Sequence, residues 1–367
     1  MSKTLLKYLN KANLINLIDN EIVYKETLIQ IHNIYYNKLS KGLKVRDIFE
    51  IKTNVNNLKL SHMQTNVNVL FYQANSLLEE HLFSFIGSFL TFEKARMHLF
   101  SLMEVIVEVS KAILNVPLFN VKSINDNEYI QYTVINGKNI EFSNFKVSQI
   151  NDLVILEGQI FLRAFLSLLI VHLNSKKELI LPHTISQLVA IIKPVKPERI
   201  GIMDYVHHID SIFNNASLPV KIINSSEYKN GKFNELKEGI PFVVRISKKE
   251  VRDKTVSIID NYLEEIYHIN ENNLITEFKT IIKNQTGEMY KRALKKSLKS
   301  ITTIKDLPII DENPYLRITW CGDKKCLNEL KGKIKPNKIY LPFNQNVSNK
   351  ECLVCKKKAH KSLLLVK

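Results

Sequence analysis

Residues 320–326 read Trp-Cys-Gly-Asp-Lys-Lys-Cys, and residues 352–355 read Cys-Leu-Val-Cys. These two stretches hold all four cysteines of the chain, Cys321, Cys326, Cys352 and Cys355. Each pair presents two thiolates from one turn, which is the arrangement that a tetrahedral metal needs. No Cys/His triad with an open coordination position is visible. The spacing therefore predicts a zinc site that supports structure rather than chemistry.

A disulfide framework is the main alternative for these cysteines. It fits less well, because nothing at the start of the sequence resembles a signal peptide and a chain of 367 residues does not need disulfides to fold. No targeting segment is evident, so we expect a cytoplasmic protein. The longest apolar run, 161–173, is interrupted by Arg163 and His172, which predicts a buried helix and no membrane span.

Positive charge is concentrated in the second half of the chain. The net charge is +16, and residues 1–175 contribute only +2 of it, from 17 basic and 15 acidic side chains. Residues 176–367 contribute +14, from 35 basic and 21 acidic side chains. Such a one-sided excess favours a nucleic-acid partner, because lysine and arginine neutralise phosphates. For any single lysine, a solvated surface charge in a Lys-rich composition is the simpler interpretation.

The first half of the sequence mixes helical and strand patterns. Helical spacing predicts one helix within residues 1–60 and a long amphipathic helix over 92–114. Their expected core positions are Leu28, Ile31, Ile34, Tyr35 and Leu39 in the first, and Leu99, Met103, Ile106, Val109 and Ile113 in the second. Alternation over 129–145, with Asn136-Gly137 in its middle, predicts a β-hairpin. A helix is expected over 159–173.

Strands and helices alternate over residues 182–260, which predicts a small α/β domain with a mixed or parallel sheet. The expected strands are 188–193, 220–223, 242–246 and 255–259, and the expected helices are 203–215 and 228–237. A basic helix follows over 274–300, and its cations are Lys291, Arg292, Lys295, Lys296 and Lys299.

The cysteine module resembles the C-terminal zinc domain of prolyl-tRNA synthetases of the archaeal and eukaryotic-like type. The resemblance rests on the Trp-Cys-Gly-Asp opening at 320–323, on Leu-Pro-Phe-Asn-Gln at 341–345 and on both cysteine pairs in the same order. Upstream, Gly-Lys-Phe-Asn-Glu-Leu-Lys-Glu-Gly-Ile-Pro at 231–241 and the stretch 242–251 are similar to that family's anticodon-binding domain. Together these motifs extend the resemblance over roughly 180–367.

The first half resembles the class II catalytic core of this family more faintly. Residues 88–98 are similar to the continuation of its motif 2, and residues 161–182 to its motif 3. This resemblance makes Arg163 the counterpart of the motif 3 arginine that stacks on ATP in active relatives. It also places Gly87 where motif 2 has the arginine that grips the α-phosphate. Gly158 is what remains of the glycine-rich approach to motif 3.

Other parts of the catalytic pattern also differ. The Arg-Trp-Glu opening of motif 2 falls near Leu-Phe-Tyr-Gln at 70–73, and the Gly-His-Thr of the proline pocket reads Lys-Ala-Arg at 94–96. Residual catalytic candidates are Arg163, Glu93 and His172. The alternatives are a buried arginine with a local acid or carbonyl, and core histidines at His172 and His98. A lone arginine does not supply the cations that adenylate formation needs.

The resemblance also implies RNA-binding positions in the second half. Lys232, Lys248 and Lys249 align near the anticodon contact, and Lys291, Arg292, Lys295 and Lys296 form the basic run of the long helix. Lysines at such positions would contact phosphates and make binding salt-dependent. For each of them, a solvated surface charge remains the alternative.

These observations predict an α/β protein of three parts. The parts are an α+β class II synthetase-like core over 1–180, an α/β anticodon-binding-like domain over 181–270, and a basic connector helix with a small zinc-bound module over 271–367. The expected function is a catalytically degenerate prolyl-tRNA synthetase-like protein that binds tRNA or another structured RNA, or an accessory subunit in translation. The alternatives are an active proline–tRNA ligase and an interaction protein without RNA binding. ATP binding stays open, and the resemblance implies a homodimer or a heterodimer with an active synthetase.

Overall fold

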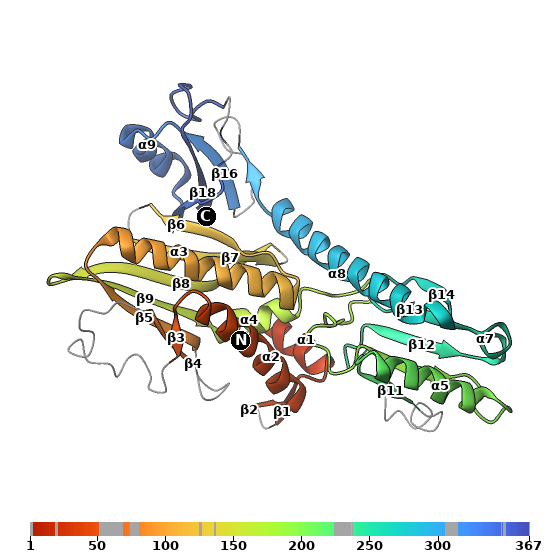
Figure 1. Cartoon of the computed structure of the whole chain (residues 1–367). Coiled ribbons are helices and arrows are strands. Elements are labelled where there is room, and N and C mark those ends of the chain that lie inside the picture. The colour runs from red at the N-terminus through yellow and green to blue at the C-terminus, as the bar shows by residue number, and fades with distance from the viewer. Residues whose placement is uncertain are drawn as a thin grey trace. The chain divides into compact units, whose positions relative to one another are not determined.

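The computed structural model describes residues 3–18, 21–50, 69–73, 81–124, 127–135, 137–223, 236, 238–304, 315–345, 347 and 350–366. The chain forms two compact units, each built from several segments (Figure 1). Unit 1 comprises Met1–Asn37, Ala112–Asn115 and Leu166–Arg292, and unit 2 comprises Lys38–Lys111, Val116–Phe165 and Ala293–Lys367. No helix among the described residues is both long enough and apolar enough to cross a membrane.

Unit 1 contains a mixed five-stranded sheet among its described residues. The strands are β10 (Ala190–Pro194), β11 (Val220–Ile222), β12 (Phe242–Ile246), β13 (Thr255–Asp260) and β14 (Ile266–Asn270), in the order β11-β10-β12-β13-β14. The pairs of β10 with β11 and β12 are parallel, and the pairs involving β13 are antiparallel. The predicted mixed α/β sheet is confirmed, with β14 as a strand that the sequence pattern did not indicate.

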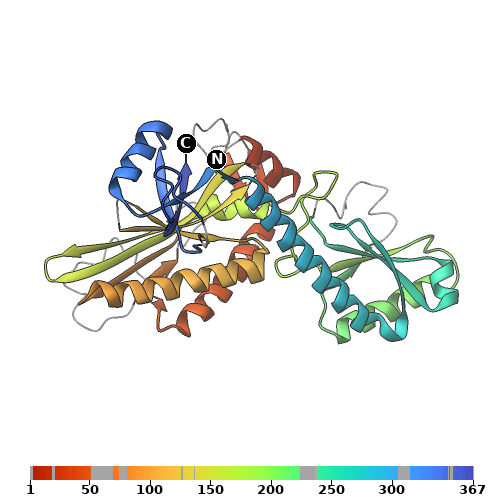
Figure 2. The same cartoon turned by 90° about the horizontal axis from the view of Figure 1, so that it is seen from above.

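Two helices cover one face of this sheet. The apolar side chains of α5 (Ile202–Asn215) and of the first turns of α8 (Leu274–Lys299) share one buried cluster with β10, β12 and β13. The rings of Phe213 and Phe278 lie 5.2 Å apart at an edge-to-face angle of 85°, which joins the two helices directly. Figure 2 shows both helices beside the strands. Both helices were predicted, whereas most of the helix expected over 228–237 lies outside the described residues.

The remaining elements of unit 1 are mostly short. They are α1 (Lys3–Lys11), β1 (Ile15–Ile18), β2 (Glu21–Tyr24), the first part of α2 (Glu26–Lys44), the last part of α4 (Leu162–Leu169), α7 (Lys248–Asp253) and the 3₁₀ turn η4 (Glu271–Asn273). The helix predicted within residues 1–60 is α2. Leu28, Ile31, Tyr35 and Leu39 are fully buried along it, as the periodicity indicates.

Unit 2 is built on an eleven-stranded sheet among its described residues. Its strands are β3 (Phe49–Glu50), β4 (Leu70–Gln73), β5 (His81–Phe89), β6 (Phe119–Ser123), β7 (Glu128–Ile135), β8 (Lys138–Ile150), β9 (Leu153–Phe161), β15 (Thr302–Thr303), β16 (Tyr315–Trp320), β17 (Lys338–Pro342) and β18 (Lys361–Val366). Their order is β15-β16-β18-β17-β6-β7-β8-β9-β5-β4-β3, and all pairs are antiparallel except β15 with β16 and β3 with β4.

The long helix α3 (Phe92–Val109) packs against β5, β8 and β9 in unit 2 (Figure 1). It begins at an N-cap, Thr91, whose side chain accepts a hydrogen bond from the Lys94 backbone, and it continues into a π-helical turn, η3 (Ser110–Leu114). Leu99, Met103 and Ile106 are fully buried, so the predicted apolar face is confirmed. The predicted hairpin is also confirmed, with β7 and β8 paired and Gly137 at φ 74° in the turn.

The helix predicted over 159–173 is wrong at both ends, because α4 ends at Leu169 and Leu173 forms a bridge with Leu179. Residues 159–161 complete β9, where Gln159 pairs with Ser84 of β5 on one side and Asn144 of β8 on the other. The helix α4 starts only at Leu162. A short apolar run does not by itself distinguish a buried strand from a buried helix. Here pairing with β5 on one side and β8 on the other makes residues 159–161 a strand.

The cysteine module shares its sheet with the rest of unit 2. Strand β17 pairs with β6, with Tyr340 opposite Ser123 and Pro342 opposite Val121. Tyr132, Tyr315 and Tyr340 lie in one buried cluster across this junction. The local sequence pattern did not indicate this pairing, because the partners are more than 200 residues apart.

Gly158 is expected to tolerate no side chain. It lies on β9 opposite Phe145, and a Cβ atom there would stand 2.0 Å from the Phe145 ring, which is fully buried. Gly158→Ala should therefore destabilise the protein by about 1–3 kcal/mol, the usual cost of overpacking. Chemical denaturation measures this effect. Gly332→Ala is the matched control.

Gly332 lies inside the helix α9 (Lys324–Ile334) with open space around it. Alanine there should stabilise the protein by about 0.5–1 kcal/mol, because glycine carries an entropic cost within a helix. Equal effects of the two alanines would contradict the packing assigned to Phe145.

Candidate metal centre and basic surfaces

The four cysteines form one cluster in unit 2. Their sulfur atoms all lie within 4.8 Å of one another, and the Sγ atoms of Cys321 and Cys355 are 3.7 Å apart. A tetrahedral ion with Zn–S bonds near 2.3 Å places its sulfurs about 3.8 Å from each other, whereas a disulfide needs about 2.0 Å. All four are free cysteines. The geometry fits a metal ion and not the disulfide alternative.

The first cysteine pair is held by a strand end and a helix start. Cys321 follows β16, and Gly322 takes a φ of 99°, which turns the chain towards α9. The Asp323 side chain caps α9 by accepting from the Lys325 backbone at 2.8 Å, and Cys326 lies in the first turn of that helix. The Trp320 indole donates to the Asp323 carbonyl at 2.9 Å. These bonds fix the direction of both thiols.

The second pair lies in a tight turn tied to the first. Within the turn, the Cys352 backbone donates to the Lys357 carbonyl at 2.7 Å, and the Lys356 backbone donates to the Cys352 carbonyl at 3.0 Å. The Leu353 backbone donates to the Thr319 carbonyl at 3.0 Å, which ties this turn to β16. Two pairs from distant stretches are therefore brought to one point by backbone hydrogen bonds.

Two thiols of the cluster have pKa values shifted in opposite directions. Burial raises the pKa of the Cys326 thiol to about 12, and the neighbouring thiols add to the shift. Burial also acts to raise the pKa of Cys352, but hydrogen bonds from the backbone N–H groups of Cys355 and Val354 outweigh it and bring that pKa to about 7. Buried thiolates need a compensating charge, and a divalent ion supplies it. The four cysteines can hold a metal ion, and a soft sulfur set favours zinc or a similar ion.

The basic run of α8 forms one exposed face. Met289, Ala293 and Ser297 are buried on the opposite side of the helix. The exposed cations are Lys291, Arg292, Lys295, Lys296 and Lys299. Lys291 pairs with Glu288 at 2.8 Å, and the Arg292 guanidinium lies 5.0 Å from the Tyr262 ring. The predicted basic face exists, and two of its five cations have local partners among these contacts.

Two of the three lysines predicted near the anticodon contact are described. Lys248 and Lys249 are exposed in the first turn of α7, whereas Lys232 lies outside the described residues. The turn is fixed by a capping box: the Ser247 side chain accepts from the Lys249 backbone, and the Glu250 carboxylate accepts from the Ser247 backbone at 2.8 Å. Ser257 also donates to Glu250 at 2.8 Å. The backbone that carries both lysines is therefore well ordered.

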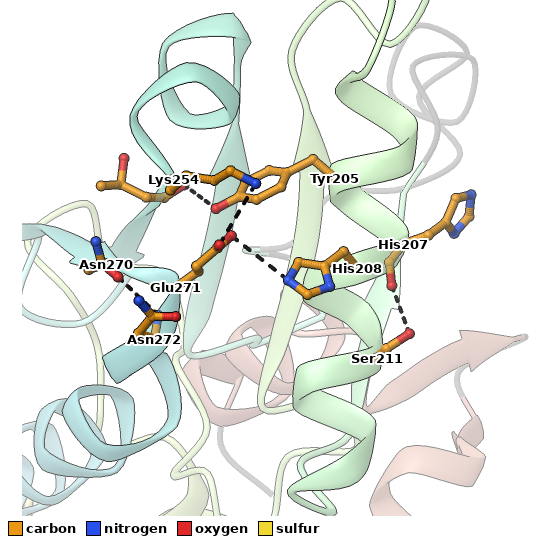
Figure 3. A network of polar contacts seen from close by, with 9 residues as sticks. Tyr205, His207, His208, Ser211, Lys254, Asn270, Glu271 and Asn272 are labelled. Atoms are coloured by element: carbon orange, nitrogen blue, oxygen red, sulfur yellow. Dashed lines mark hydrogen bonds and ion pairs between the residues drawn. The ribbon is translucent and has the colours of Figure 1, made fainter.

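A polar network in unit 1 escaped the sequence analysis. Glu271 of η4 lies between the Lys254 ammonium, at 3.9 Å, and the His208 ring of α5, at 3.8 Å (Figure 3). The Tyr205 hydroxyl donates to the Thr255 carbonyl at 3.2 Å, and Lys254 lies 5.8 Å from the Tyr205 ring. The network ties α5 to the strand and turn beside it. No local motif signals it, because its members are spread over 67 positions.

Comparison with known proteins identifies the cysteine module. Residues 307–367 match the family described as "Prolyl-tRNA synthetase, C-terminal". The cysteine module is thus a prolyl-tRNA synthetase C-terminal domain by sequence. The match covers both cysteine pairs and strands β16, β17 and β18. The predicted family resemblance is confirmed.

Curated relatives agree with this assignment. The proline–tRNA ligase of Thermoplasma acidophilum is 24% identical over 183 residues, 49% of this chain and 39% of that protein. That of Oceanobacillus iheyensis is 25% identical over 199 residues, 53% and 41% of the two chains. That of Sulfurisphaera tokodaii is 28% identical over 176 residues, 45% and 36%. The matches span about two fifths of the length of these relatives.

The residual catalytic candidates Arg163, Glu93 and His172 do not share one environment. Arg163 is exposed near the start of α4, and Glu93 is exposed in the first turn of α3, both in unit 2. His172 is buried in unit 1, where its Nε2 lies 2.7 Å from the Leu114 carbonyl and its ring packs on Tyr262. His98 packs on Phe89 at 5.1 Å, and burial lowers its pKa. The contacts of both histidines are those of structural residues.

Gly87 lies in the middle of β5, opposite Leu156 of β9. A Cβ atom at Gly87 would stand 3.0 Å from the Phe89 ring and 3.2 Å from Val69. The position is buried. The space that a longer side chain would need at Gly87 is thus occupied by apolar groups.

Proposed function

We propose that this protein is a non-catalytic prolyl-tRNA synthetase-like protein that binds tRNA or another structured RNA and acts as an accessory component in translation. Its parts are a class II-like core over 1–180, an anticodon-binding-like domain over 181–270, and a connector helix with a structural zinc module over 271–367. Cys321, Cys326, Cys352 and Cys355 hold the zinc, which fixes the fold of the module.

The observation that carries the loss of catalysis is Gly87. In the family pattern this position is the arginine that grips the α-phosphate, and here it is a buried glycine at which a Cβ atom would already be in tight contact with Phe89 and Val69. Adenylate formation needs cations aimed at the charge that develops on the α-phosphate, and loss of one such group costs about 10²–10³ in rate. Arg163 alone, at the motif 3 position, does not replace it.

The sheet of unit 2 supports the class II-like core. Strand β5, which carries Gly87, pairs along its length with β9, and β9 leads directly into α4 with Arg163 as its second residue. Gly87 on β5 and Arg163, two residues after the end of β9, therefore lie on paired or directly following elements, which is compatible with one nucleotide site in an active relative. The core keeps the scaffold of the family while its phosphate-binding side chain is missing.

Charge supports the RNA-binding part of the proposal. The second half of the chain carries +14 of the net charge, and its cations on α7 and α8 are exposed on well-ordered backbone. Lys291 of α8 pairs with Glu288 at 2.8 Å. Exposed lysines and arginines on ordered elements provide the phosphate contacts that dominate RNA affinity. The protein would act as a homodimer or beside an active synthetase.

Removing charge from α8 tests this surface. The variant Lys295→Gln/Lys296→Gln/Lys299→Gln should bind tRNA at least about tenfold more weakly at low salt. It should also reduce the slope of log affinity against log salt by about 2, because each lost phosphate contact removes roughly 0.7–0.9 from that slope. Fluorescence anisotropy with labelled tRNA across a salt series measures both quantities.

Lys38→Gln/Lys41→Gln/Lys44→Gln is the matched control. These lysines are also exposed and lie at the end of α2, so the variant loses the same charge from a helix of similar polarity. It should leave the slope unchanged. If both variants bind tRNA equally weakly, α8 contributes only general electrostatic attraction. That result would contradict a defined contact surface on α8.

A further inference from the structure

The positive charge of the chain is not spread evenly over its second half. Residues 315–367, which form the zinc module, hold 13 basic and 3 acidic side chains, a net of +10 out of the total of +16. Residues 176–314, which include the anticodon-like domain and α8, carry the remaining +4 of the second half. The module has a core of its own around the cysteines, so its lysines are displayed on a fixed scaffold.

Strands β16 and β17 end, and strand β18 begins, at the same edge of the module, which we call the knuckle end. It comprises Cys321 after β16, Lys361 at the start of β18, and Phe343 after β17, together with the turn 352–358. Trp320 pairs with Lys361 across β16 and β18. Gln345 links the third strand: its side chain accepts from the Ser362 backbone at 2.6 Å and donates to the Pro342 carbonyl.

Lysines crowd this end on a turn with fixed backbone. Lys356, Lys357 and Lys358 follow Cys355 directly, and all three are exposed. Their backbone is held by the two bonds between Cys352 and residues 356 and 357, and by the bridge between Glu351 and Lys358. Lys361 lies 6.0 Å from the Trp320 ring. Because the backbone of the turn is already fixed, phosphate binding by these lysines costs side-chain entropy but little backbone entropy.

Asp323 and Glu351 supply negative charge close to the lysines of the knuckle end. The carboxylate of Asp323 is engaged as the N-cap of α9, and Glu351 is exposed at the base of the turn. Two further lysines, Lys324 and Lys325, are exposed in the first turn of α9. Cations therefore outnumber carboxylates around both cysteine pairs.

An exposed aromatic side chain lies at the same end. Phe343 is 40% exposed and Phe100 of α3 is 44% exposed, and their rings meet edge to face at 5.3 Å and 81°. Tyr129 packs against both rings. A ring held in place by two others while keeping part of its surface open is a platform on which a nucleobase can stack.

We propose that the knuckle end of the zinc module is a primary RNA-binding surface of this protein, with Lys356, Lys357, Lys358 and Lys361 on phosphates and Phe343 under an unpaired base. This inference rests on the proposed RNA-binding function and names the surface and the kind of RNA: a strand with at least one unstacked base beside a phosphate backbone. A competing role for the lysines is to offset the negative charge of a zinc ion with four thiolates, which is a formal −2. In that role they would affect zinc retention and not RNA.

The test uses the full chain loaded with zinc and two variants. Lys356→Gln/Lys357→Gln/Lys358→Gln should keep stoichiometric zinc and an unchanged melting temperature, while the salt slope of RNA binding falls by about 2. Phe343→Leu should weaken binding to an RNA with a single-stranded 3′ end by about fivefold or more, and leave binding to a blunt RNA duplex unchanged. The α2 variant Lys38→Gln/Lys41→Gln/Lys44→Gln is the charge control.

Several outcomes would overturn the inference. If the wild type binds RNA and the triple-lysine variant has the same slope of log affinity against log salt, the knuckle end does not bind RNA. RNA binding must then lie elsewhere on the protein. If the triple-lysine variant loses zinc but keeps its RNA affinity, these lysines stabilise the metal centre and do not bind RNA. Equal effects of Phe343→Leu on both RNAs exclude stacking. Failure of the wild type to bind any RNA refutes the proposed function itself, and so differs from failure of this surface alone.

Discussion

Cys352→Ser is expected to release the metal and unfold the zinc module. Cys352 is fully buried, and its sulfur accepts hydrogen bonds from the backbone N–H groups of Cys355 and Val354. Structural zinc contributes about 10–16 kcal/mol of apparent folding free energy in small domains. The apolar cluster of the module, including Trp320, Leu353 and Leu363, packs around the cysteines and has no other anchor of that strength.

The sequence supplies a convenient probe of this event. Trp320 is the single tryptophan of the chain, lies next to Cys321 and is 6% exposed. Its fluorescence should shift to longer wavelength in Cys352→Ser, and in the wild type after a strong chelator removes the zinc. Metal analysis should give one zinc per wild-type chain. Because β17 pairs with β6, hydrogen exchange should also rise in β6.

Val354→Ala is the control for the zinc prediction. It changes a partly buried residue between two ligands and keeps all four cysteines. It should retain zinc and native fluorescence. A wild-type protein purified without zinc, or a Cys352→Ser variant with unchanged fluorescence, would contradict the metal assignment.

Proline-dependent exchange of pyrophosphate into ATP is expected to stay at background for this protein. The missing cation at Gly87 alone accounts for about 10²–10³ in rate, and the altered proline-pocket residues at 94–96 add to the loss. Gly87→Arg is not expected to restore activity. A Cβ atom there already stands 3.0 Å from Phe89 and 3.2 Å from Val69, so an arginine should overpack this buried position and make the variant less stable than the wild type.

The exchange assay needs a positive control from an active relative, such as the proline–tRNA ligase of Thermoplasma acidophilum. Exchange above background that requires proline, and that Arg163→Ala abolishes, would contradict the non-catalytic proposal. It would establish the divergent active ligase instead.

Local sequence signals were sufficient where chemistry or periodicity is local. The four cysteines signalled one cluster, and Leu99, Met103 and Ile106 signalled the buried face of α3. Local sequence signals were insufficient where a residue pairs with residues far away in the sequence. Residues 159–161 belong to β9 because β5 and β8 flank them, and Tyr340 joins Ser123 across the sheet. Glu271 meets Lys254 and His208 only after folding, so no spacing rule would have found that network.

Binding of the full protein to proline tRNA and to an unrelated tRNA, measured side by side across a salt series, tests the central claim most directly. The account predicts strongly salt-dependent binding to tRNA, because Lys248 and Lys249 of the anticodon-like domain are exposed on ordered backbone, where they can contact phosphates. Equal binding to both tRNAs would reduce the role to general RNA binding. No measurable binding to either tRNA at low salt would contradict the account.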